Sequence, residues 1–198
     1  KVKSNMKRIL LVVLLFSLKL FGQNAQEKLH SDSNKNIGFF NITKVGLLGV
    51  TEMKQEQFIE GEGTFAHELD AGVAWNVQVV NGYFLSPYFS LGIGVGLEWY
   101  SNPDFNTLPV VLDIRSYISD LENTPYLFLD VGPNIKLGNQ SNFKKGLSVN
   151  IGLGYKYQVS KGFFLVSDIC YSYDKVNLSS PDDKIYAKGI GLSVGVIF

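Results

Sequence analysis

Large apolar residues alternate with small or polar residues along most of the chain from Phe39 onward. The segment 189–198, GIGLSVGVIF, places Ile190, Leu192, Val194, Val196 and Phe198 at one parity and Gly189, Gly191, Ser193 and Gly195 at the other. The segment 89–100, FSLGIGVGLEWY, has the same design. Because successive side chains of a strand point to opposite faces, this alternation predicts strands with one apolar face and one small or polar face.

Eight such runs follow one another, and none shows a convincing helical period. Each reaches the roughly 9 to 11 residues that a tilted transmembrane strand needs. The predicted strands are 41–50, 65–79, 89–100, 108–118, 127–137, 147–158, 163–174 and 188–198.

The predicted connections alternate between short and long. Asn81-Gly82 is a strong signal for a two-residue hairpin, and 120–123 and 160–162 are also short. Short turns on one side and long loops on the other are typical of outer-membrane barrels. The longer polar connections are 51–63, 101–106, 138–145 and 177–184.

The composition of the polar face distinguishes a membrane barrel from a soluble, lipocalin-like ligand-binding barrel. A soluble barrel would turn its glycine-rich polar face to water, whereas a membrane barrel turns it to the lumen. Charges of both signs can pair in a narrow lumen, and neighbouring glycines make room for them. We therefore predict an all-β, eight-stranded, antiparallel up-and-down transmembrane β-barrel. Its polar face carries Glu68, Asp70, Glu98, Asp113, Arg115, Asp130, Lys136, Lys156 and Asp168.

The first residues have the character of a cleavable signal peptide. Met6 is followed by a basic Lys7-Arg8 pair and a short apolar run, 9–16, that is too short to span a bilayer. We expect a signal peptide with upstream residues at 1–23, a flexible lead-in at 24–38 and the barrel at 39–198.

Composition narrows the function classes. Aromatic residues make up 13% and charged residues 18% of the chain, which has 20 glycines. The leader holds five of the 18 bases, so the remainder carries 13 bases against 18 acids, unlike the basic face of a nucleic-acid binder. The single cysteine, Cys170, cannot form an intramolecular disulfide.

The segments 108–118, LPVVLDIRSYI, and 189–198, with the aromatic Phe198 at its end, resemble the outer-membrane-protein β-barrel family. The resemblance is to its small OmpA- and OmpX-like, porin-type members. It implies insertion in the bacterial outer membrane, with the lipid bilayer and lipopolysaccharide as partners. It implies no particular activity.

The candidate site is an interior ion-pair network of Glu98, Asp113, Arg115 and Asp130, interpreted as a plug that satisfies buried charge. The alternative is a gate on a narrow ion path. His67, with Ser101 or Asp104, is the weaker catalytic candidate, and Asp182-Asp183 is interpreted as a solvated loop tip. We predict no catalytic residues, cofactor or metal.

The leading functional hypothesis is a non-enzymatic barrel with an envelope-structural or surface-interaction role, acting through external loops 51–63 and 177–184. The alternatives are a narrow pore or transporter for small solutes, a soluble periplasmic or secreted ligand-binding barrel, and a lipid-acting outer-membrane enzyme.

Overall fold

The computed structural model describes residues 36–101, 104–137, 143–178 and 183–198. Among these residues, no helix is long and apolar enough to cross a membrane. The strands of the described ranges are β1 (Gly38–Ile59), β2 (Gly63–Glu68), β3 (Val73–Ser86), β4 (Phe89–Ser101), β5 (Asp104–Tyr117), β6 (Thr124–Lys136), β7 (Phe143–Ser160), β8 (Phe163–Leu178) and β9 (Lys184–Ile197).

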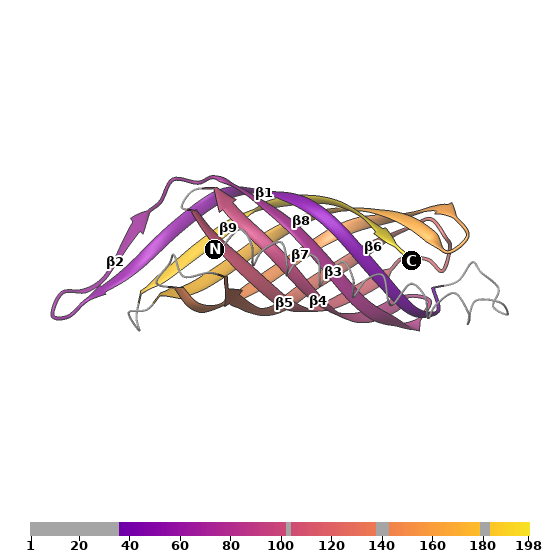
Figure 1. Cartoon of the computed structure of the whole chain (residues 1–198), viewed down its shortest axis with the longest axis horizontal. Helices are drawn as coiled ribbons and strands as arrows, with labels where there is room; N and C mark the ends of the chain where they lie inside the picture. The colour runs from indigo at the N-terminus through magenta and orange to yellow at the C-terminus, as the bar shows by residue number, and fades with distance from the viewer. Residues whose placement is uncertain (1–35, 102–103, 138–142, 179–182) are drawn as a thin grey trace, which may run out of the picture.

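Antiparallel pairing of consecutive strands closes the sheet into a barrel (Figure 1). β1 pairs with β3 through Gly38–Gly49 and with β9 through Ile42–Glu56, so the first and last strands meet. Of the described strands, eight form this ring and β2 lies outside it. The predicted eight-stranded antiparallel barrel is confirmed.

A long hairpin projects from one end of the barrel. β1 continues past a bulge between Val50 and Glu52, and its residues Lys54–Ile59 pair with β2. In Figure 1 this hairpin extends beyond the other strands, at the end opposite the C-terminus. The connections at 87–88, 118–123 and 161–162 are short. Short turns mark the periplasmic end of such barrels, so the hairpin projects outward.

Large apolar side chains lie outside and charged side chains lie inside. The outward face includes Ile93 at 66%, Leu192 at 60% and Val194 at 60% exposure, whereas Asp113 and Arg115 are fully buried. Apolar residues around the whole exterior suit lipid, because lipid tails satisfy no charge. The predicted direction of the two faces is confirmed, and the soluble ligand-binding barrel is wrong.

The predicted hairpin at Asn81-Gly82 is wrong. Both residues lie inside β3, and the turn is at 87–88. Gly82 packs closely beneath Phe40, and a Cβ at this position would lie 2.6 Å from the carbonyl oxygen of Leu91. The glycine therefore serves close packing inside the barrel rather than a turn.

The predicted strand boundaries near the hairpin also need correction. Residues 51–59, predicted as a loop, continue β1, and the predicted strand 65–79 is divided between β2 and β3. Glu68 and Asp70, predicted to face the lumen, are exposed. Beyond the membrane a strand needs no apolar face, so alternation does not reveal it.

The predicted signal peptide at 1–23 lies outside the described residues, as does most of the predicted lead-in at 24–38. At the end of the lead-in, Asn36 is buried at the periplasmic mouth. Its Nδ2 donates to the carbonyl oxygen of Pro87 over 2.8 Å, and its Oδ1 accepts a hydrogen bond from Lys156.

Two apolar clusters fill the lumen on either side of its charged middle. The first lies toward the periplasmic end and the second toward the hairpin. The first is Phe40, Ile42, Val80, Phe84, Tyr117, Tyr126, Phe128, Val166 and Ile197, and the second is Leu48, Val50, Met53, Ala74, Tyr100 and Ala187.

Candidate functional site

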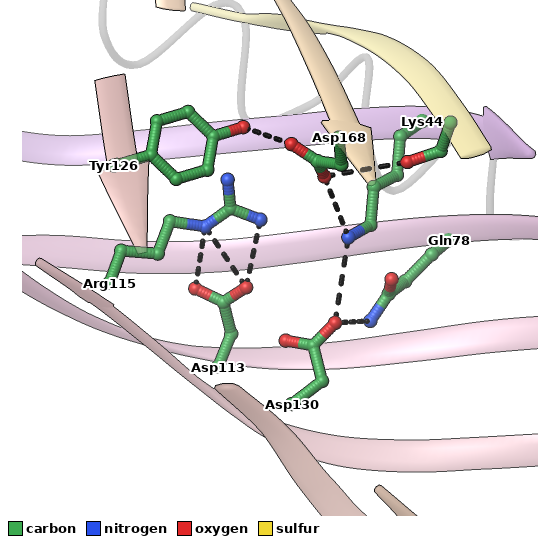
Figure 2. A network of polar contacts seen from close by, with 8 residues as sticks. Lys44, Gln78, Asp113, Arg115, Tyr126, Asp130 and Asp168 are labelled. Carbon is green, nitrogen blue, oxygen red and sulfur yellow. Dashed lines mark hydrogen bonds and ion pairs between the residues drawn. The ribbon is translucent and has the colours of Figure 1, made fainter. Parts of the chain in front are cut away.

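Lys44 of β1 is at the centre of the charged layer (Figure 2). Its Nζ lies 3.5 Å from Oδ2 of Asp130 and 3.2 Å from Oδ2 of Asp168, and all three side chains are buried. The Nε2 of Gln78 donates a hydrogen bond to Asp130 Oδ2 over 3.2 Å. The hydroxyl of Tyr126 donates to Asp168. One cation thus joins acids from β6 and β8.

Arg115 of β5 forms the second centre of this layer. Its Nε lies 3.0 Å from Oδ1 of Asp113, and its Nη2 lies 2.9 Å from Oδ2 of the same carboxylate. The guanidinium also lies 4.9 Å from the ring centroid of Tyr126 and 5.5 Å from that of Phe128. Both members of the ion pair are 0% exposed, so the pairing replaces the water that each charge lost.

Small residues beside these charges give them room. Asp113 is paired across the strands with Gly92, and Asp168 is paired with Gly154. A Cβ at Gly154 would meet the Asp168 carboxylate and the Tyr126 ring, and a Cβ at Gly92 would lie 2.7 Å from Cγ1 of Val80.

The four predicted site residues fall into two groups. Asp113, Arg115 and Asp130 belong to the charged layer, where Arg115 binds Asp113 and Asp130 binds Lys44. Glu98 lies nearer the hairpin end, and its Oε2 accepts a hydrogen bond from Thr107 over 3.0 Å. We name the charged layer, Lys44, Gln78, Asp113, Arg115, Tyr126, Asp130 and Asp168, the lumen network.

Lys44 and Asp168 were absent from the predicted ion-pair network. Lys44 lies in the weakest predicted strand, although it alternates with the outward Val45 and Leu47. This alternation is the sequence signal that could have identified Lys44 as an inward-facing residue. Asp168 was assigned to the polar face, but pairing across 124 residues of sequence is not visible in a local pattern.

A second polar cluster lies above the lumen network. Asp174 of β8 accepts hydrogen bonds from the Tyr100 hydroxyl over 2.8 Å, from Ser172 Oγ over 3.1 Å and from Asn134 Nδ2 over 3.3 Å. Asp174 and Glu98 are close enough to repel each other. We name Glu98, Tyr100, Thr107, Asn134, Ser172 and Asp174 the upper cluster.

The other candidate residues lie outside both clusters. His67 is exposed in β2 and pairs with Gln55, and Ser101 Oγ donates to the carbonyl oxygen of Val73. Asp183 Oδ1 accepts a hydrogen bond from the backbone of Phe58, and Asp182 lies outside the described residues. Among the described side chains, no three or more His, Cys, Asp or Glu residues group as metal ligands.

Three solved structures are similar to this chain at low sequence identity. Neisserial surface protein A is 15% identical with a TM-score of 0.52, covering 81% of this chain and 96% of that one. AlkL in lipid bilayers is 16% identical with a TM-score of 0.49, covering 85% and 93%. OprG from Pseudomonas aeruginosa is 13% identical with a TM-score of 0.47, covering 82% and 99%.

No protein-family model and no curated protein sequence matches the chain. The likeness to the Neisserial protein shows the fold, that of a small outer-membrane β-barrel. With its apolar exterior, the chain is a transmembrane barrel that embeds in a lipid bilayer.

Proposed function

We propose that the protein is a non-enzymatic barrel of the bacterial outer membrane that makes surface contacts through its projecting hairpin. The observation that carries this proposal is the extension of β1 and β2 past the rest of the barrel (Figure 1). A membrane anchor alone does not need a strand pair that reaches so far beyond the bilayer.

The filling of the lumen supports a role on the outside rather than transport. Arg115, the two acids bound to Lys44, and two apolar clusters occupy the interior along its length. Eight strands enclose a lumen only wide enough for side chains. We interpret the lumen network as a plug that stabilises the barrel.

The hairpin is anchored so that it can present a defined surface. Lys188 of β9 lies 3.1 Å from Glu52, and Lys54 lies 2.9 Å from the same carboxylate. The backbone of Phe58 donates to Asp183 Oδ1 over 3.0 Å, which ties the hairpin to the connection before β9. β8, β9, β1 and β2 thus form one continuous sheet above the barrel.

Exposed apolar residues mark this sheet as a contact surface. Phe58 is 45% exposed and Phe65 is 41% exposed, although both lie outside the apolar belt. The neighbouring Glu60 and Glu62 are exposed acids, so the surface suits a partner with apolar and basic groups. At the base of the sheet, Lys54 and Lys188 are the cations that we propose to contact lipopolysaccharide phosphates.

Shortening the hairpin tests the proposal. Deleting residues 56–66 joins Gln55 to His67, which already face each other across the hairpin. Cells that display the shortened protein should lose attachment to surfaces while the barrel keeps its faster migration on unboiled gels. A matched control replaces Lys161, in the turn at the opposite end, with Ala. Equal attachment by the shortened and intact proteins would refute the surface role.

A further inference from the structure

The upper cluster contains two buried carboxylates, one from β4 and one from β8, that are close enough to repel each other. Glu98 is 6% exposed and Asp174 is 1% exposed. Tyr100, two residues after Glu98 on β4, reaches across to Asp174 with its hydroxyl. The two acids therefore belong to one compartment, which borders the apolar cluster of Leu48, Val50 and Met53, because Tyr100 belongs to both.

The positive charges of the lumen that the structure describes are bound elsewhere, and Lys156 lies at the periplasmic mouth, where it donates to Asn36. Lys44 is bound to Asp130 and Asp168, and Arg115 is bound to Asp113. Among the side chains that the structure describes, no ion pair reaches Glu98 or Asp174. Buried carboxylates without a counter-charge are strongly disfavoured in the ionised state.

An independent observation concerns Asn134, which is 0% exposed. Its Nδ2 donates to Asp174, so the amide lies against this carboxylate, but its Oδ1 is buried without a hydrogen-bond partner. Such an orphaned acceptor is rare, and in native proteins it commonly signals an ion or water that completes the site. The compartment thus offers two carboxylates and one free amide oxygen.

We propose that the upper cluster binds a divalent, oxygen-seeking cation between Glu98 and Asp174, with Asn134 Oδ1 as a neutral ligand. A divalent ion balances the two carboxylates. Calcium accepts six to eight oxygen ligands in flexible geometry, including carboxylates, amide carbonyls and waters. Thr107 and Tyr100 hold the two carboxylates in place through their hydroxyl groups.

The test uses the full chain, purified in detergent without lipopolysaccharide, which itself binds cations. Tb³⁺ replaces Ca²⁺ at oxygen sites, and a nearby tyrosine excites its emission. We expect sensitised emission that Ca²⁺ displaces, and a higher unfolding temperature in Ca²⁺ than in a chelator, because a ligand of the native state stabilises it.

Conservative variants locate the ion. Glu98→Gln and Asp174→Asn should weaken Tb³⁺ binding by about 100-fold or more, since even outer-shell partners commonly contribute about 10- to 100-fold. Tyr100→Phe should reduce the emission while Ca²⁺ protection remains. The control Glu62→Gln, at the exposed hairpin turn, should behave as wild type. Equal binding by wild type and both acid variants would overturn the proposal.

Within the chain, Lys136 is the alternative to a bound cation as the counter-charge of the two acids. Its backbone pairs with that of Thr107, whose hydroxyl donates to Glu98. If the cation is bound as proposed, Lys136→Gln keeps the Ca²⁺ response of wild type. A Ca²⁺ response that appears only in Lys136→Gln would identify the lysine as the counter-charge and overturn the proposal. Stability that depends on pH but not on Ca²⁺ would also overturn it, in favour of a proton shared by the two acids.

Discussion

Asp113→Ala removes the partner of the most deeply buried cation in the barrel. Arg115 would lose its bonds of 3.0 and 3.1 Å from Nε and 2.9 Å from Nη2 to the Asp113 carboxylate. Its Nη1 has no partner to begin with, so its remaining favourable contacts are with the faces of the Tyr126 and Phe128 rings. The guanidinium is 0% exposed, so water cannot replace the carboxylate.

Breaking a buried ion pair by removing one member costs about 3 to 5 kcal/mol. Asp130 is a neighbour of Asp113 in the lumen and offsets part of this cost, so we expect about 3 kcal/mol for Asp113→Ala. Removing both charges in Asp113→Ala/Arg115→Met leaves no uncompensated ion. The double variant should therefore recover most of the loss, although it does not restore the original packing.

Equilibrium unfolding in urea, with the barrel in phospholipid vesicles, measures these free energies. The chain has two tryptophans, Trp75 and Trp99, which report the transfer of the outer wall from lipid to water. The unboiled gel band shows whether each variant assembles. A loss below about 1 kcal/mol for Asp113→Ala, or a double variant as unstable as the sum of the single variants, would refute the argument from buried charge.

Three further predictions concern packing, pH and conduction. Gly82→Ala should cost about 1 to 3 kcal/mol of unfolding free energy because its Cβ would lie 2.6 Å from a carbonyl oxygen of β4, whereas at Gly49 the nearest atom is 3.8 Å away and alanine should be tolerated. Hydrogen bonds from Lys54 and then Lys188 hold the pKa of Glu52 below its ordinary value of 4.5. The ionised Glu52 therefore stabilises the hairpin above pH 4.5, and this stabilisation is lost as the pH falls through the lowered pKa of Glu52. Acid should therefore increase the opening of residues 54–68, measured by hydrogen exchange, more in wild type than in Glu52→Gln. In planar bilayers the intact barrel should carry no steady current, because side chains fill its lumen. A steady conductance that is larger in Asp113→Ala/Arg115→Met would show an open lumen and contradict the plug.

The membrane-spanning wall could be predicted from the sequence because each strand there must satisfy lipid on one side and a narrow lumen on the other. The predicted strand 89–100 and the observed β4, Phe89–Ser101, differ by one residue. Beyond the bilayer this constraint ends. Residues 51–59 extend β1 through hydrogen bonds to β9 and β2, with polar residues on both faces, so their sequence has no strand pattern.

The hairpin error at Asn81-Gly82 has a different physical origin. Local sequence shows that a glycine is present, but not whether it is needed for a turn or for space. Among the described residues, the glycines with positive φ are Gly38, Gly61, Gly63 and Gly162. Gly82 is absent from this group, and the ring of Phe40 occupies the space beside it.

Cross-strand register explains why the polar residues of the lumen were easier to predict than their partners. Alternation identifies an inward residue, but its partner depends on the tilt and closure of the whole barrel. Glu98 and Arg115 both point inward, yet tilt carries Glu98 to Asp174 rather than to Arg115. The sequence could therefore predict that the lumen is charged, but not how its charges pair.

The spacing of glycines relative to charges offers a way to recover part of this missing information. Asp113 is paired with Gly92, Asp168 with Gly154 and Lys44 with Gly195. In each case a long or charged inward residue has a neighbour without a side chain on one adjacent strand, which leaves it room in the narrow lumen of eight strands. A glycine on one neighbouring strand is enough to make this room, because Asp113 also pairs with Asp130 and Lys44 also pairs with Gln78. Glycines at inward positions therefore indicate where the wall leaves room for a long or charged side chain, whereas the pairing of one charge with another follows from the closed barrel.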